Sequence, residues 1–285
     1  MFANYLLLFH LFTFSHFHFK LCFVKISAVI IAHNEEAKIA DAINSVIWAD
    51  EILLVDSEST DQTREIAESL GAKVIVQKWL GFSKQKQFAV DSAENDWILS
   101  LDADEQISEK LKTEILELKN LSADKLADGY KIPRLSIYMN RPIRHSGWYP
   151  DWQLRFFNRT KGKWKDVIIH ESVEMQSDAK IGKLSKDILH LSVENAAHHH
   201  RMIGERYAPL AAKQMFERGK RTSPFKIAFS AWSTFVQTYF LKLGFLDGFA
   251  GFSIAYFAAH HAFLKHLLLY EMQNEISDSK FQIPD

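Results

Sequence analysis

The chain has 285 residues, of which 47% are hydrophobic and 24% charged, so it is long and apolar enough for one sizeable folded domain plus a smaller appendage. Its formal net charge of -1 gives no general affinity for polyanions such as nucleic acids, and any attraction to phosphate or to a membrane must come from local patches. Cys22 is the single cysteine, which excludes an internal disulfide and is typical of a reducing cytoplasm.

Residues 1–24 form an apolar N-terminal extension. Residues 1–19 contain no Lys, Arg, Asp or Glu, whereas a secretory signal peptide begins with basic residues. The run is near the minimum length of a membrane span, but His10, His16 and His18 interrupt it. Three interpretations stay open: a membrane anchor, a segment on the membrane surface, and residues translated upstream of the true start.

Residues 25–195 are predicted to form one α/β domain. Four strands are predicted, at Ile26–Ala32, Glu51–Val55, Lys73–Gln77 and Trp97–Leu101, and the first of these runs is short, apolar and β-branched, as expected for a buried parallel strand. Helical spacing fills the segments between them, including Phe82–Ala93. This alternation predicts a parallel sheet with helices on both faces, and in such sheets ligands bind beyond the carboxyl ends of the strands.

Polar residues follow three of the four predicted strands. They form the clusters His33 to Glu36, Asp56 to Asp61 and Asp102 to Glu105. Loops alone explain polarity, but they do not explain why acidic residues gather at one edge of a sheet. We therefore predict the binding site at this edge.

Asp102 and Asp104 flank one small residue at the end of the fourth strand. Such a pair can hold a divalent cation through oxygen ligands and leave positions for diphosphate oxygens. The metal would neutralise charge on a departing nucleoside diphosphate. The alternative is that both acids only favour the N-terminus of the following helix.

Five further residues are candidate nucleotide-sugar ligands. Asp56 can accept a hydrogen bond from a base, or can form an Asx turn or helix cap instead. Asn34 and Glu35 can meet the ribose or base, or can cap a helix. Lys84 and Lys86 can face the diphosphate, or can belong to a solvated helix face.

The remainder of the chain changes character twice. Aromatic and basic strand-like pieces between Gly129 and His190 predict a mixed β region that completes a cleft. Residues 196–285 are predicted to be helical, first basic and then aromatic on one helical face. This composition favours a segment that associates with an anionic membrane surface. The alternative is a helical subdomain packed on the core, and a full span is disfavoured because Asp247 and three glycines interrupt the apolar run.

Three motifs together resemble the family 2 glycosyltransferases of the GT-A fold. They are Ile26–Glu36 (ISAVIIAHNEE), Ile52–Thr63 (ILLVDSESTDQT) and Trp97–Glu105 (WILSLDADE), in this order and spacing. A narrower resemblance links nearly all the chain after Lys25 to bacterial lipopolysaccharide inner-core β-1,4-glucosyltransferases, which add glucose to a heptose. Its motifs are Gly147–Phe157 (GWYPDWQLRFF), His170-Glu171 and Leu246–Leu269.

The resemblance implies a Rossmann-like mixed sheet flanked by helices, an inverting transfer of a hexose from a UDP-sugar, and Mg²⁺ or Mn²⁺. It implies glucose as the sugar and a lipopolysaccharide core heptose as the acceptor. By this analogy Asn34, Glu35 and Asp56 contact the uridine, Asp102 lies near ribose and metal, and Asp104 binds the metal. From the basic and aromatic C-terminal segment we expect peripheral attachment to the cytoplasmic face of the inner membrane.

Inversion requires a carboxylate that deprotonates the attacking hydroxyl, and Asp151 and Glu171 are the candidates. Asp151 is slightly preferred because similar enzymes carry an Asp ahead of such a Gln-Leu-Arg-Phe-Phe segment. A salt bridge to Arg155 is the alternative for Asp151, and an exposed strand position is the alternative for Glu171. Arg155 and Arg144 are candidate phosphate ligands.

Three other functions compete with this interpretation: transfer of a sugar to a polyprenyl phosphate, a non-catalytic scaffold that binds nucleotide-sugars, and a nucleotidyltransferase. The last lacks the expected glycine-rich loop after the first strand. The full Gln-x-x-Arg-Trp signature of processive synthases is absent, which predicts transfer of a single sugar.

Overall fold

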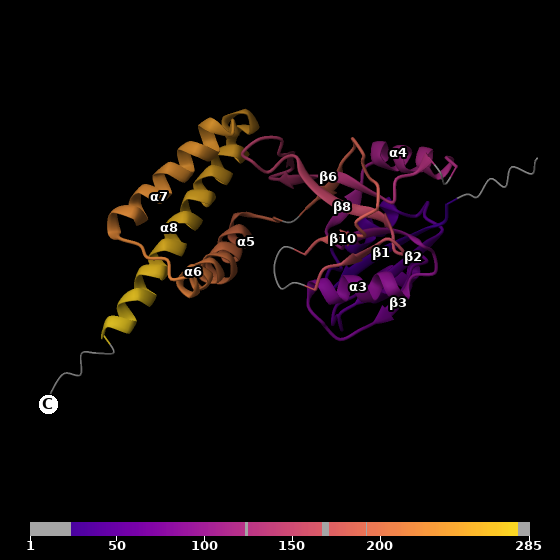
Figure 1. Ribbon diagram of the computed structural model, residues 1–285, viewed down its shortest axis with the longest axis horizontal. Coiled ribbons are helices and arrows are strands. Elements are labelled where there is room, and N and C mark those ends of the chain that lie inside the picture. Colours follow the sequence, from indigo (N-terminus) through magenta and orange to yellow (C-terminus); the bar gives the residue numbers. More distant parts are fainter. Residues whose placement is uncertain (1–23, 123–124, 167–170, 192, 279–285) are drawn as a thin grey trace, which may run out of the picture.

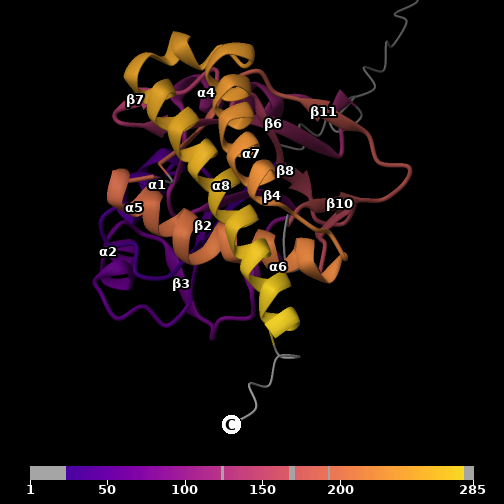
Figure 2. The same cartoon turned by 90° about the vertical axis from the view of Figure 1, so that its left-hand side faces the viewer.

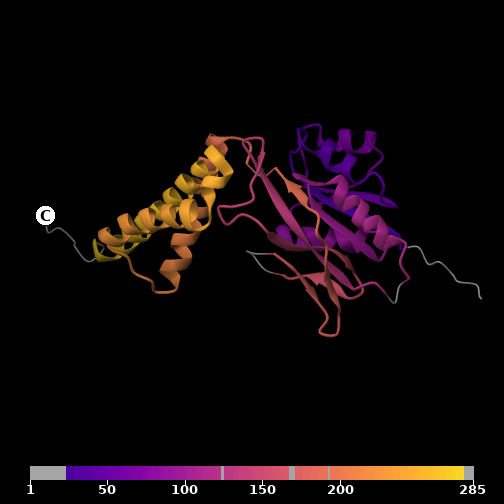
Figure 3. The same ribbon diagram turned by 90° about the horizontal axis from the view of Figure 1, so that it is seen from above.

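The computed structural model describes residues 24–122, 125–166, 171–191 and 193–278. Residues 1–23 of the apolar extension, with Cys22, lie outside the described residues, as does His170. Figure 1 shows two parts side by side, an α/β domain and a set of C-terminal helices, and Figure 3 shows the same division from above.

The first half of the sheet is parallel. Its strands are β1 (Ile26–Ala32), β2 (Glu51–Asp56), β3 (Lys73–Val76) and β4 (Trp97–Asp102), in the order β3-β2-β1-β4. Every residue of β1 is buried, as expected for a central parallel strand covered on both faces. The predicted strand and helix alternation is confirmed here.

The second half of the sheet is mixed. β8 (Asp151–Asn158) pairs antiparallel with β4, and β6 (Gly129–Tyr138) pairs antiparallel with β8. β12 (Ile188–His190) runs parallel to β6, and β5 (Glu105–Ile107) closes that edge. The short strands are β7 (Arg141–Pro142) and β11 (Ile181–Lys183), which pair with β6, and β9 (Gly162–Trp164) and β10 (Val173–Met175), which form a separate ribbon. The expected mixed sheet is therefore confirmed.

Helices cover both faces of this sheet. They are α1 (Ile39–Ser45), α2 (Thr63–Ser69), α3 (Phe82–Ser92) and α4 (Glu109–Lys119). Alternate residues of β1 pack into different cores: Ile30 faces the core that contains α1 and α4, and Val29 faces the core that contains α3. Side chains on a strand alternate between faces, so one strand organises both layers.

The helix after β1 begins beyond the polar run 33–36, so neither Asn34 nor Glu35 is its N-cap residue. Asn34 has φ 55°, in the left-handed region, and α1 begins only at Ile39. Asn residues tolerate this conformation, and it turns the chain at the strand end instead of continuing into a helix. The polar residues are thereby placed on a loop at the edge of the sheet.

The C-terminal helices begin at Ala196, where the helical region was predicted to begin. They are α5 (Ala196–Arg201), η2 (Met202–Tyr207), α6 (Ala208–Glu217), α7 (Pro224–Val236), η3 (Gln237–Leu241), η4 (Gly244–Asp247) and α8 (Gly248–Asp278). α7 lies alongside α8 (Figure 2). Among the described residues no single helix is long and apolar enough to cross a membrane, but Pro224–Leu241 and Gly244–Asn274 meet that criterion together, as a pair bent by 69°.

A third hydrophobic core joins the helices to the α/β domain. Tyr138 and Ile143 come from the sheet side, Ala250 and Ile254 come from α8, and Trp148 packs against them. Part of the helical region is therefore packed on the domain, as the alternative interpretation expected, while other residues of α7 and α8 are exposed aromatic side chains, described below.

Candidate active site

Asp56 and Asp102 lie on either side of the end of β1. Ala32 pairs with Asp56, and Ile31 pairs with Asp102. Because β2 and β4 flank β1 in the sheet, two acidic residues that are far apart in sequence meet at one edge. The expected gathering of polar residues is thus present in the structure.

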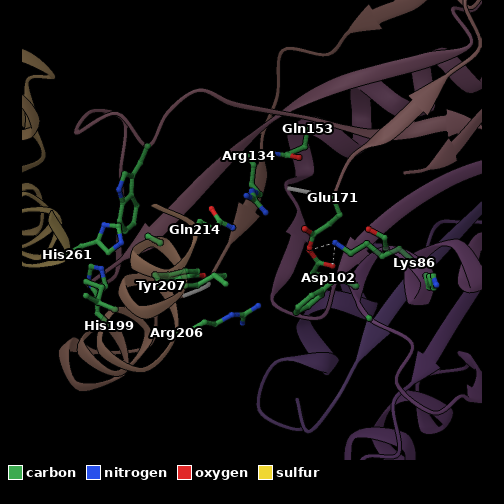
Figure 4. A pocket seen from close by; sticks show the side chains of 18 of the residues that line it. Lys86, Asp102, Arg134, Gln153, Glu171, His199, Arg206, Tyr207, Gln214 and His261 are labelled. Carbon is green, nitrogen blue, oxygen red and sulfur yellow. Dashed lines mark hydrogen bonds and ion pairs between the residues drawn. The ribbon is translucent and has the colours of Figure 1, made fainter. Parts of the chain in front are cut away.

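Asp102 is held by two buried cations, of which Figure 4 labels Lys86. The Nζ atom of Lys86 lies 2.8 Å from Oδ1 of Asp102, and Nη2 of Arg155 donates to Oδ2 at 2.9 Å. Burial by itself raises the pKa of Asp102, but Lys86 and Arg155 outweigh it and hold the pKa well below its usual range. Three predicted site residues therefore form one ion cluster.

Glu105 completes this cluster, although the sequence assigned it no separate role. Its carboxylate is fully buried and accepts hydrogen bonds from Arg155 at 3.1 Å and from Arg134 at 3.0 Å. The backbone N–H of Asp102 also donates to Glu105, at 3.0 Å. The available signal was its position three residues after Asp102, but only the strand order brings both arginines to it.

Arg155 keeps unused donors. Its Nε and Nη1 atoms are buried and have no hydrogen-bond partner among the described residues. Buried N–H groups are nearly always satisfied, so this guanidinium is suited to an anionic ligand in the adjoining cleft. Arg144, the other predicted phosphate ligand, lies 5.3 Å over the ring of Tyr149 and is not among the residues that line the cleft.

Asp104 lies beside His190, whose Nε2 atom is 3.4 Å from Oδ2 of Asp104. Burial raises the pKa of Asp104, and His190 overcomes this so that the pKa is lowered. Within the described ranges, no three His, Cys, Asp or Glu side chains are grouped to hold a metal ion. A hard cation prefers oxygen ligands, so Asp104 and Asp102 fit one only if diphosphate oxygens and water supply the other ligands.

Asp56, Asn34 and Glu35, which were predicted to contact the nucleotide, lie at the same edge of the sheet. Asp56 is fully buried, and its Oδ2 accepts from the Ser59 N–H at 2.9 Å, while Oδ1 has no partner in the described part of the chain. The side chain of Asn34 accepts from the Thr60 N–H at 2.8 Å and so ties the two loops together. Asp56 therefore has one acceptor atom without a partner among the described residues, whereas the side-chain oxygen of Asn34 already accepts a hydrogen bond from the backbone.

Glu35 and Lys84 form ion pairs outside the cluster of Asp102, Lys86 and Arg155. Glu35 lies 3.4 Å from Lys38, and burial raises its pKa. Lys84 is 59% exposed and lies 3.5 Å from Asp166, although both residues line the cleft. The structure brings Lys86 to Asp102 and leaves Lys84 at the rim.

A cleft of about 1110 Å³ lies between the ion cluster and the C-terminal helices. Lys86, Asp102 and Arg155 line one side. The other side is formed by His199, Arg206, Tyr207, Gln214 and His261 (Figure 4). A second cavity of about 410 Å³ adjoins it and shares Arg134, Trp148, His199, Ile203 and Tyr207.

The two candidate bases differ in their surroundings. Asp151 lines the smaller cavity and lies 2.7 Å from Nη2 of Arg134, and its second oxygen accepts from Gln153 at 2.7 Å. The alternative salt bridge between Asp151 and Arg155 is wrong, because strand pairing places Arg134 of β6 opposite Asp151. Glu171 lines the larger cleft with Asp102 (Figure 4), half-buried and without an ion pair to any described residue.

Residues 27–176 match the model of a family described as "Glycosyl transferase family 2". An "Uncharacterized glycosyltransferase" of Rickettsia bellii is 36% identical over 260 residues, which cover 87% of each chain. The "Lipopolysaccharide core biosynthesis glycosyltransferase LpsC" of Rhizobium meliloti is 28% identical and covers 86% of this chain and 92% of its own.

The chain is also similar to two solved structures. S. aureus TarS 1–349 in complex with UDP-GlcNAc is 17% identical, with a TM-score of 0.45, over 92% of this chain and 93% of that one. Glucosyl-3-phosphoglycerate synthase from Mycobacterium tuberculosis, in complex with Mn²⁺, UDP and glucosyl-3-phosphoglycerate, is 24% identical, with a TM-score of 0.33, over 40% of this chain and 44% of that one.

Proposed function

Because the chain belongs to glycosyl transferase family 2, we propose that it transfers a hexose, with glucose as the first candidate, from a UDP-sugar to a heptose of the lipopolysaccharide inner core. The observation that carries the proposal is the buried ion cluster of Asp102, Lys86 and Arg155, which lines a large cleft at the carboxyl edge of the parallel strands. The similarity to LpsC supports the choice of acceptor.

The donor half of the site follows from the unpaired atoms at this edge. Oδ1 of Asp56 accepts an N–H of the uracil ring, and the free N–H groups of Arg155 bind the diphosphate. Asp102 and Asp104 would hold Mg²⁺ or Mn²⁺ together with diphosphate oxygens. When bound, the cation neutralises charge that develops on the leaving UDP.

The acceptor hydroxyl attacks the anomeric carbon from the face opposite the diphosphate. The new glycosidic bond forms while the bond to UDP breaks, and a carboxylate takes the hydroxyl proton, so the anomeric configuration inverts. We prefer Glu171 as this base because it lines the same cleft as Asp102 and has no ion-pair partner among the described residues. Asp151 becomes the second choice because both of its oxygens accept hydrogen bonds already.

Attachment to the cytoplasmic face of the inner membrane is proposed through the exposed side of α7 and α8. Phe225, Phe229 and Trp232 recur on one face of α7 and are 79%, 51% and 62% exposed. Phe249 and Tyr256 of α8 are 70% and 61% exposed. Aromatic side chains on a helix with few charges suit the boundary between head groups and acyl chains.

The test is UDP release by the purified chain with Mg²⁺ or Mn²⁺, from UDP-glucose, UDP-galactose and UDP-N-acetylglucosamine. Each donor is offered alone, with heptose-containing lipopolysaccharide core, and with a polyprenyl phosphate. Release from UDP-glucose that the core stimulates supports the proposal, and stimulation by the polyprenyl phosphate instead selects the alternative acceptor. A folded protein that binds UDP but releases none from any donor would be a scaffold.

A further inference from the structure

Asp247, which interrupts the apolar helical region, is hydrogen-bonded to a loop of the catalytic domain. It lies in η4, between α7 and α8, and is 6% exposed. Its carboxylate accepts from the backbone N–H groups of Arg144 at 3.2 Å and His145 at 3.0 Å. The Nδ1 atom of His145 and the hydroxyl of Ser146 lie 3.0 Å and 3.4 Å from the same carboxylate. A buried carboxylate with four such contacts holds a loop more than 100 residues away in sequence.

The glycines that interrupt the apolar run allow this contact. A Cβ atom on Gly244 would lie 2.7 Å from the carbonyl oxygen of Thr238 and 2.9 Å from the hydroxyl of Ser146. A Cβ atom on Gly251 would lie 1.8 Å from the carbonyl oxygen of Gly244. Any larger residue would push the segments apart. The break between the helices is therefore a close-packed joint to the catalytic domain.

The loop held by this joint carries Trp148 to the cleft. Ser146 and Gly147 adopt φ values of 61° and 79°, which turn the chain immediately before Trp148. The indole is half-buried and lines both the large cleft and the smaller cavity. It is packed 6.0 Å from the ring of Tyr138 and 6.2 Å from that of His199, measured between centroids.

Trp148 thus stands where the two cavities meet. The larger one contains Asp102 and the candidate base Glu171, and the smaller one contains Asp151. An indole face is a good surface for the apolar C–H face of a sugar ring, because it is large and rigid. A sugar stacked on Trp148 would lie in the cleft that Asp102, Lys86 and Arg155 also line.

On the basis of the proposed transferase function, we infer that Trp148 binds the acceptor sugar and that Asp247 is a positioning residue, which holds the 143–150 loop so that Trp148 reaches it. The helical region then completes the acceptor side of the active site, in addition to any contact with a membrane. Its polar interruption is a part of the site and not a defect in a membrane segment.

The closing experiment compares Asp247→Asn and Trp148→Ala with the wild-type chain, using UDP-glucose and heptose-containing lipopolysaccharide core oligosaccharide. Both variants should raise KM for the oligosaccharide about tenfold or more. Asp247→Asn should in addition leave UDP release from donor alone within about twofold, because Asp247 does not line the cleft. Trp148→Phe should recover most of the acceptor affinity. The matched control is Asp178→Asn, which removes an exposed carboxylate paired with Lys161 at 3.1 Å and should change neither quantity.

A second readout does not depend on the donor or the acceptor. Hydrogen exchange at the amides of Arg144 and His145 should quicken in Asp247→Asn, while β1 and β4 keep their protection. If Asp247→Asn does not fold, His145→Ala removes one contact and should raise KM by a smaller factor.

Three outcomes would overturn the inference. They are unchanged hydrogen exchange at the amides of Arg144 and His145 in Asp247→Asn, an unchanged KM for the oligosaccharide in Asp247→Asn or Trp148→Ala, and an equal loss of donor-only and acceptor-dependent UDP release in Asp247→Asn. Failure of the wild-type chain to release UDP from any donor would instead reject the transferase proposal, and the exchange measurement would still test the joint.

Discussion

The sheet domain buries charged side chains in ion pairs, whereas the C-terminal helices contain a long stretch with few charged side chains. In the sheet domain the buried charges Lys86, Arg155 and Glu105 are matched by partners from other strands and helices of the same chain. In the helices, residues 227–264 contain only two formally charged side chains, Lys242 and Asp247, and many aromatic residues are exposed. The sheet domain thus has a charged site suited to a polar ligand. The helices have apolar surface that no described residue covers.

This contrast favours the proposed division between chemistry in the sheet domain and membrane attachment through the helices. Buried ion clusters are expensive unless every member is satisfied, and Arg155 and Asp56 each keep buried polar atoms without a partner among the described residues. Exposed aromatic residues destabilise the folded chain little. Covering them with another apolar phase would be favourable, because apolar surface is then removed from water. The joint at Asp247 connects the two regions.

The largest expected effect is on activity, and it comes from replacing Asp104 or Asp102, two substitutions that should differ in their effect on stability. Asp104→Ala should lower UDP release by about a thousandfold or more, because the proposed metal ligand is lost, and should leave the fold intact. Asp102→Ala should lose activity and also about 3–5 kcal/mol of unfolding free energy, because Lys86 and Arg155 would remain buried without it. Urea denaturation and UDP release measure both variants, and full activity of Asp104→Ala in excess chelator would contradict the metal role.

The next effect decides between the candidate bases. Glu171→Gln should lower kcat about 10²–10⁴-fold at an unchanged KM for the donor, because the proton acceptor is removed. Asp151→Asn should lower it far less, because Asp151 is already bonded to Arg134 and Gln153. Single-turnover transfer to the core oligosaccharide measures both rates, and a reversed order would restore Asp151 as the base.

A change in the helical region should leave the chemistry intact. Replacing Phe225, Phe229 and Trp232 together by Ser should weaken binding to vesicles that contain anionic phospholipids about a hundredfold, because exposed aromatic area is lost. UDP release with a soluble oligosaccharide should stay unchanged. Ile181→Ser with Leu121→Ser is the control for exposed apolar residues of the sheet domain. Equal vesicle binding by the α7 variant and the control variant would contradict a specific role of the helices in membrane attachment.

The smallest effect concerns His199, at the interface of the two regions. Burial lowers its pKa from about 6.5 to about 4, and His198 adds to the shift. The unfolded chain therefore binds a proton on this residue first, and stability should fall as the pH falls from about 6.5 towards 4. His199→Phe keeps the ring packing against Phe257 and removes this titration. Urea midpoints across that range should decline less steeply in the variant than in the wild-type chain.

Local patterns in the sequence were sufficient for the strands and for the edge that carries the site. The short apolar runs of β1 and β4 predict buried parallel strands, and the carboxyl ends of such strands fix where Asp56 and Asp102 lie. These predictions need only the spacing of apolar residues along a short segment, which is a local property.

Only the tertiary structure decided which charges are paired. Arg134 meets Asp151 and Glu105 because β6 lies between β8 and β12, an order that no periodicity encodes. The sequence showed Asp247 as an interruption of an apolar run, and folding makes it the acceptor for a distant loop. Residue spacing determines which side of an element is buried, but the partner of a buried polar group depends on how distant elements are arranged around it.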